Sequence, residues 1–150
     1  MTNRVAALSV TVVTVVASGA SASGPLQFPQ SFEQGVHYAT VERGNIREEL
    51  YTSGPAIEAA KKGAPFPDGT VNTLVDHRDG KLYRYVVMEK RHGSGAEYPP
   101  DVRNGDWKYQ EFTAEKSVNS SEDGTRCMRC HMSQERDDFV FTANRMKSVK

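Results

Sequence analysis

The chain has 150 residues, and its 19 basic and 19 acidic side chains cancel at neutral pH. That length predicts one domain, and the charge balance excludes a general basic field that would attract nucleic acid or an anionic membrane. Hydrophobic residues make up 37% of the chain and there are two cysteines, which excludes a disordered protein and a disulfide-rich scaffold.

The first 22 residues have the pattern of a secretory signal peptide. Arg4 is the only charged side chain among them, and an apolar run over residues 5–16 precedes an Ala-Ser-Ala sequence that ends at Ala22. A basic start, a short apolar run and an A-x-A site are typical of a cleaved signal. The run is shorter than the roughly 20 residues of a membrane span. We therefore predict export to a bacterial periplasm, no membrane contact after cleavage, and a single domain over residues 23–150.

Residues 52–65 carry the signals of one short helix. Ser53 can accept hydrogen bonds from the free amides of a first turn, and Pro55 suits the first helical position. Gly63 can adopt the left-handed conformation that ends a helix, and Pro65 prevents its continuation. The sequence therefore predicts a helix from Pro55 to Lys62.

Segments that favour β-structure lie on both sides of this helix. The turn Arg78-Asp79-Gly80-Lys81 has Asp-Gly at its centre, which predicts an antiparallel hairpin around it. The expected strands are Val36–Glu42, Ile46–Tyr51, Val71–Val75, Leu82–Met88 and Trp107–Phe112, with an irregular arm over residues 24–35 and a long loop over Arg91–Asp106. The expected fold class is α+β, an antiparallel sheet with a few short helices.

Residues 127–131 form a C-x-x-C-H motif that contains both cysteines of the chain. Two thiols at this spacing can reach the two vinyl groups of one porphyrin, and His131 then lies beneath the iron. Covalent attachment of this kind takes place outside the cytoplasm, so the motif and the export signal agree. The sequence predicts one haem c, attached through Cys127 and Cys130 near the C-terminal end, with His131 as the axial iron ligand.

Three other uses of this motif stay open. A redox-active cysteine pair usually begins a helix within a βαβ unit, and no such unit is predicted before Cys127. A structural disulfide over so short a loop would add little stability. A zinc site would need a further ligand, for which His37, His77 and His92 are the candidates.

The position of the motif indicates how the iron is coordinated. Small electron-transfer cytochromes carry it near the N-terminus and take a distant methionine as sixth ligand, but here only 19 residues follow His131. Met132 is too close to reach the other haem face, Met146 is a poor candidate, and Met88 is expected in the core. The other three histidines have polar neighbours and are expected in solvated loops. We infer an open iron site for a small gaseous or nitrogenous ligand such as NO or CO.

Several motifs, taken in order, resemble those of the cytochrome P-460 and cytochrome c′-beta family over roughly Ile46 to Thr142. They are Ile46-Arg47, Lys61-Lys62-Gly63, Phe66-Pro67-Asp68-Gly69-Thr70-Val71, Trp107-x-x-x-x-Phe112, the C-x-x-C-H sequence and Asp138-Phe139-Val140-Phe141-Thr142. The resemblance implies a β-rich homodimer with a five-coordinate haem and a distal pocket. It places Arg47 where the family has a distal-pocket arginine; the alternative is a surface arginine paired with Glu48 or Glu49.

The chain departs from the hydroxylamine-oxidising members of that family at one position. In those members a lysine cross-linked to the macrocycle lies five positions after the glycine of Asp-Gly-Thr-Val, and here that position is Leu74. The nearest acids to the haem motif, Glu122 and Asp123, do not align with the family's distal carboxylate. The resemblance is therefore to the gas-binding branch. Enzymatic oxidation of a nitrogen compound, with a cross-link through Lys81 or Tyr83, and electron transfer to a redox partner protein are the alternatives.

Overall fold

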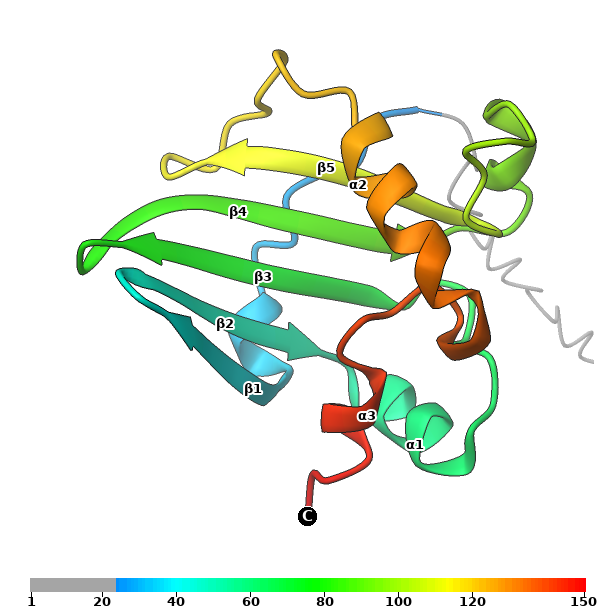
Figure 1. Cartoon of the computed structure of the whole chain (residues 1–150), viewed down its shortest axis with the longest axis horizontal. Helices are drawn as coiled ribbons and strands as arrows, with labels where there is room; N and C mark the ends of the chain where they lie inside the picture. Colours follow the sequence, from blue (N-terminus) through cyan, green and yellow to red (C-terminus); the bar gives the residue numbers. More distant parts are fainter. Residues whose placement is uncertain (1–23) are drawn as a thin grey trace, which may run out of the picture.

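In the part of the chain that the structure describes, residues 24–150, five antiparallel strands form one sheet in sequence order (Figure 1). The structure is a computed structural model, and the predicted signal peptide over residues 1–22 lies outside the described residues. The strands are β1 (Val36–Arg43), β2 (Ile46–Thr52), β3 (Val71–Arg78), β4 (Lys81–Lys90) and β5 (Trp107–Thr113). The helices are α1 (Gly54–Lys62), α2 (Thr125–His131) and α3 (Ala143–Met146), with 3-10 segments η1 (Phe32–Gln34), η2 (Ser94–Glu97) and η3 (Met132–Asp137). The α+β class and the antiparallel sheet predicted from the sequence are confirmed.

The local signals that predicted the helix and the hairpin act as expected. Ser53 is the N-cap of α1, where its side chain accepts a hydrogen bond from the Ala56 amide, and Gly63 ends the helix with φ of 62°. At the β3–β4 turn both Asp79 and Gly80 have positive φ, 51° and 73°. Two such residues match the twist of the flanking strands, so the turn itself sets the register of the hairpin.

The hairpin strands are longer than the sequence predicted. β3 continues to Arg78 and β4 to Lys90, beyond the apolar segments Val71–Val75 and Leu82–Met88. The added positions are polar, which is why the sequence pattern assigned them to turn and loop. They remain in the sheet because side chains such as those of Asp76 and Arg84 pair across it.

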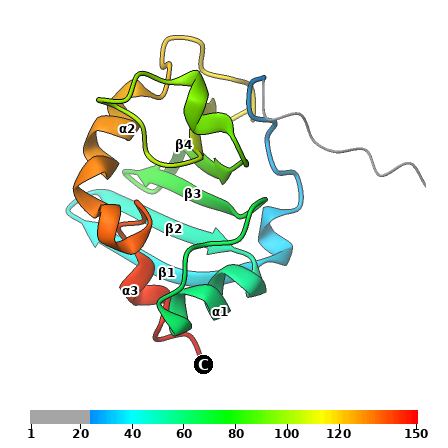
Figure 2. The ribbon, with the colours of Figure 1, turned by 90° about the vertical axis from the view of Figure 1, so that its right-hand side faces the viewer.

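The segment before β1 covers one face of the sheet. Leu26 and Phe28 are buried there against a cluster that includes Val87. Phe28 makes edge-to-face contacts with the rings of Tyr85 and Phe112, with ring centroids 4.9 and 5.3 Å apart. Figure 2 shows this segment and α2 on opposite sides of the sheet.

The C-terminal segment, defined as residues 125–146, lies over the other face of the sheet, with α2 in front of β4 and β5 and α3 beside α1 (Figure 1). The hydroxyl groups of Tyr38 and Thr142, 2.8 Å apart, join β1 to this segment. Within residues 24–150, every helix is too short or too polar to cross a membrane. This face carries the main core cluster and the site described next.

Candidate functional site

A cavity of about 670 Å³ lies between the sheet and the C-terminal segment. Its walls come from β1 to β5 on one side, and from α2 and residues 140–142 on the other. This volume is within the range of pockets that hold organic cofactors and ligands. The cavity is therefore large enough to hold a prosthetic group between the two layers.

All three chemically active residues of the C-x-x-C-H motif line this cavity. Cys127, Cys130 and His131 belong to α2, whose first turn is packed closely against β5. Gly124 precedes the helix with φ of 79°, and a Cβ atom there would lie 2.9 Å from the Tyr109 carbonyl oxygen. Cysteines three apart lie one above the other on a single helical face, so both thiols belong to the same wall of the cavity.

The imidazole of His131 is oriented by a backbone carbonyl. Its Nδ1 lies 2.6 Å from the carbonyl oxygen of Phe139, which can only accept a hydrogen bond. Nδ1 therefore carries the proton and Nε2 is left free, which is the arrangement found in metal-binding histidines. Burial lowers the pKa of His131 even though the Phe139 hydrogen bond opposes this effect, so the ring is in the neutral form that binds metals. The rings of Tyr109 and Phe141, each centred 5.0 Å away, fix its plane.

An unusual turn presents the Phe139 carbonyl to His131. Asp138 and Phe139 both have positive φ, 50° and 62°, a conformation that residues other than glycine seldom adopt. Three contacts hold the turn. The Trp107 indole donates to the Asp138 carbonyl at 2.8 Å, and the Asp138 carboxylate accepts from the Phe66 amide and from the Lys90 ammonium. The backbone conformation is thus fixed by β4, β5 and the loop after α1.

The sheet wall of the cavity is apolar at its centre. Leu74 on β3 is paired with Leu50 on β2 and with Val86 on β4, and all three side chains line the cavity. Met88 continues this surface along β4. A flat organic ring system of low polarity would bury its faces against these side chains.

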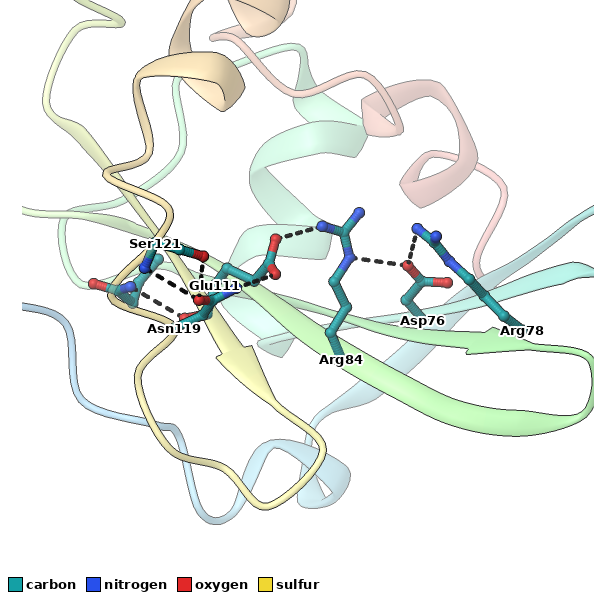
Figure 3. A network of polar contacts seen from close by, with 7 residues as sticks. Asp76, Arg78, Arg84, Glu111, Asn119 and Ser121 are labelled. Carbon is teal, nitrogen blue, oxygen red and sulfur yellow. Dashed lines mark hydrogen bonds and ion pairs between the residues drawn. The ribbon is translucent and has the colours of Figure 1, made fainter.

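One end of the cavity is charged. Asp76 is 1% exposed and accepts hydrogen bonds from Arg84 Nε at 3.0 Å and from Arg78 Nη2 at 3.2 Å (Figure 3). Arg84 also bonds to Glu111, which in turn accepts a hydrogen bond from Asn119. A buried carboxylate is stable only when it is paired, and this network supplies the partners.

Three arginines belong to the lining of the cavity. Arg43, Arg84 and Arg126 all line it, and Arg43 is paired with Glu48 at 2.7 Å. Guanidinium groups are well suited to bind carboxylates. The sequence reasoning missed these arginines, although the alternation of Arg84 with Val86 on β4 was a signal that could have placed Arg84 on the same face.

Comparison with known proteins agrees with this geometry. The family model for cytochrome P460 matches residues 27–142. The chain belongs to the cytochrome P460 family. A search among curated proteins found no similar sequence. Membership in the cytochrome P460 family indicates a haem c protein, and it confirms the family resemblance seen in the sequence.

The residues of the cavity fit the haem that membership in the cytochrome P460 family implies. Two free thiols, one imidazole with a free Nε2, an apolar wall and several guanidinium groups surround one space. These are the groups that would form two thioether bonds, bind iron, cover the ring and neutralise propionates. Leu74, the position of the cross-linking lysine in the hydroxylamine-oxidising members, lines this same space.

Arg47 does not lie at the cavity. Along β2 it is Glu48 and Leu50 that line the cavity, so the alternation of the strand directs Arg47 to the other face. Its side chain is 54% exposed and pairs with Glu49 at 2.8 Å and with Glu42 at 3.7 Å. This corrects the distal-pocket assignment that the resemblance implied and agrees with the surface alternative.

The other uses of the motif find less support. Burial raises the pKa of the Cys127 thiol, whereas a redox-active cysteine requires a lowered one. Within residues 24–150, no three His, Cys, Asp or Glu side chains gather as a metal site, and none of His37, His77 and His92 lines the cavity. Both cysteines are free thiols in this structure. Met146 is fully buried in the core, while Met88 borders the cavity.

Proposed function

We propose that this protein is an exported, periplasmic c-type cytochrome that binds a small ligand such as NO or CO at an open iron site. Cys127 and Cys130 hold one haem through thioether bonds, and His131 is its axial ligand. The observation that carries the proposal is the hydrogen bond between His131 Nδ1 and the Phe139 carbonyl, which leaves Nε2 free at a cavity lined by both cysteines.

The composition of the cavity wall supports an open ligand site. Among the residues of the described chain that line it, His131 is the only histidine, and aliphatic side chains form the centre of the facing wall. When bound, the haem supplies an iron that coordinates small molecules and exchanges electrons. The chain's own contribution is to orient the imidazole, exclude water with Leu50, Leu74 and Val86, and hold propionates with arginines.

Absorption spectra of the protein, matured with haem c in a periplasm, test this proposal. We expect a high-spin, five-coordinate ferric spectrum that changes when NO or CO is added to the reduced form. The Cys127→Ala, Cys130→Ala double variant should lose covalent haem, and His131→Ala should lose the axial ligand. A protein without covalent haem would overturn the proposal. The homodimer that the family resemblance implies and a redox partner protein are also part of this proposal, and sedimentation of the haem-loaded protein tests the homodimer.

Electron transfer is a second candidate because Met88 borders the cavity. A thioether bound to the iron would complete a six-coordinate, low-spin site. In that case the wild-type protein would have sharp low-spin bands and the Met88→Leu variant would become high-spin. A wild-type protein that is already high-spin rules this candidate out.

For oxidation of hydroxylamine-type compounds the chain lacks one residue: Leu74 stands where the hydroxylamine-oxidising members have a cross-linked lysine. The Leu74→Lys variant restores an amine to the cavity wall. A reduced Soret band that stays at its ordinary wavelength, with no gain of oxidation, is the expected result. A strongly red-shifted band together with new activity would instead assign this site to an oxidase that has lost one residue.

A further inference from the structure

The side-chain amide of Asn72 is buried without a partner. The residue is 6% exposed, and among residues 24–150 neither its Nδ2 nor its Oδ1 has a hydrogen-bond partner. Buried polar atoms are hydrogen-bonded in the great majority of folded proteins, and each exception requires an explanation. A partner from outside the chain is one such explanation.

A second buried asparagine shows what a structural amide looks like in this fold. Asn104 is 1% exposed, and its Nδ2 donates to the Tyr109 hydroxyl and to the Met128 carbonyl, both at 3.0 Å. It therefore joins β5 to α2. Asn72 makes no such connection, so its amide is not used to hold elements together.

The position of Asn72 is at the cavity. It lies on the face of β3 that carries Leu74 two residues on, and it is paired in register with Met88 on β4; all three residues line the cavity. The hydroxyls of Tyr38 and Thr142, two other polar residues that line the cavity, bond to each other. Asn72 is thus a polar group with free hydrogen-bonding capacity beside an apolar surface.

We propose that the Asn72 amide binds the small ligand of this cavity by donating an N–H to a ligand atom that accepts a hydrogen bond. The proposal rests on the proposed function, because it requires an open iron site. It specifies the ligand class: small nitrogenous or anionic molecules with a good acceptor atom are favoured over CO, which is a poor acceptor. An amide has no charge to lose, so this preference does not depend on its protonation.

The test compares two ligands in the haem-loaded protein. Cyanide binding to the ferric form and CO binding to the ferrous form are measured by absorbance for the wild type and for Asn72→Leu. We expect the cyanide dissociation constant to rise roughly 10- to 100-fold, as for a hydrogen bond to a charged group. The CO dissociation constant should change little, and the infrared C–O stretch should move to higher wavenumber. Asn45→Leu, the same change at an exposed turn, is the matched control.

The outcomes separate this inference from the proposed function. Equal changes for both ligands, or no change, in a variant with a normal five-coordinate spectrum would overturn the role of Asn72 and leave the haem site standing. A low-spin or haem-free wild type would overturn both. If Asn72→Leu takes up no haem, Asn72→Val, which suits a strand, is used instead. The unfolding midpoints of Asn72→Leu and the wild type are also compared, both with haem and without added ligand. A lower midpoint for the variant would mean that the amide is structural and would also overturn the inference.

Discussion

At the scale of single residues, one hydroxyl contact joins the first strand to the C-terminal segment. Tyr38 and Thr142 are 104 positions apart in the chain, and their side-chain oxygens are 2.8 Å apart. Burial raises the pKa of Tyr38 to about 12, with the Thr142 hydrogen bond acting in the opposite direction. The phenol is therefore held in its neutral form more firmly when folded than when unfolded.

This difference predicts a stability that depends on alkaline pH. A group whose pKa is raised by folding contributes stability below its unfolded pKa and loses it as pH rises through the folded one. Between pH 10 and 12 the free energy of unfolding of the wild type should fall by about 2 kcal/mol more than that of Tyr38→Phe. Urea unfolding of both proteins at several pH values measures this. If the free energy of unfolding falls with pH equally in the two proteins, folding does not raise the pKa of Tyr38.

At the scale of elements, the turn after η3 connects the fold to the imidazole. The Asp138 carboxylate accepts two hydrogen bonds, from the Phe66 amide and the Lys90 ammonium, and its backbone carbonyl accepts one from Trp107. The neighbouring residue then directs its carbonyl at His131. A change in this carboxylate should therefore alter both stability and the iron environment.

Adjacent aspartates provide a matched pair for this prediction. Asp138→Ala should lower the free energy of unfolding by about 2–3 kcal/mol, because it leaves two donors without their acceptor. Asp137→Ala removes only a half-exposed contact with Lys147 at 3.7 Å and should cost less than about 0.5 kcal/mol. Denaturation curves measure both, and the haem spectrum should change in Asp138→Ala alone. Equal losses of unfolding free energy in the two variants would contradict the role of the Asp138 carboxylate in holding this turn.

The β3–β5 network gives a second prediction at this scale. Arg84→Leu leaves Asp76 buried with only Arg78, so the free energy of unfolding should fall by about 3–5 kcal/mol. Arg47→Leu removes an exposed pair with Glu49 and should cost less than about 1 kcal/mol. Chemical unfolding of the two variants compares a buried with an exposed arginine on the same sheet. A small loss for Arg84→Leu would mean that water reaches Asp76.

At the scale of the whole molecule, the sequence predicted the elements that depend on local signals better than it predicted the faces on which side chains lie. The N-cap at Ser53 and the Asp79-Gly80 turn depend on a few neighbouring residues, so the sequence predicted α1 and the central hairpin. The face of the sheet on which a side chain lies is harder to predict, because a shift of one residue along a strand moves every side chain to the opposite face. Arg47 and Glu48 are both charged, so hydrophobicity does not show which of them faces the cavity; the assembled sheet places Glu48 there. The unpaired amide of Asn72 likewise depends on what every other element leaves unbonded.

The C-terminal segment was predicted as a motif but not as helices. α2 and α3 are seven and four residues long, too short to be stable by propensity alone. Their helical form depends on packing against the sheet, through contacts such as that of Met128 in the main core cluster. Such contacts join distant parts of the chain and leave no local signal in the sequence.

A haem-free variant should show this dependence directly. In the Cys127→Ala, Cys130→Ala protein we expect amides of residues 125–146 to exchange with solvent much faster than those of β3 and β4. The reason is that the cavity lies between part of this segment and the sheet, so the haem-free protein lacks contacts that a bound group would provide there. Hydrogen exchange followed by mass spectrometry measures the difference. Equal protection in the two regions would mean that the segment is stable without the group.

The strand order of the sheet has a consequence for how the protein is assembled. Each strand pairs with its sequence neighbour, so every loop that must close during folding of the sheet connects consecutive strands. The contacts that join the C-terminal segment to the rest of the fold span much longer loops, 72 residues for Phe66 with Asp138 and 104 for Tyr38 with Thr142. The sheet can thus fold first and act as a template, which would leave the two thiols accessible for the haem attachment proposed above. We expect enclosure of the site to follow formation of the sheet.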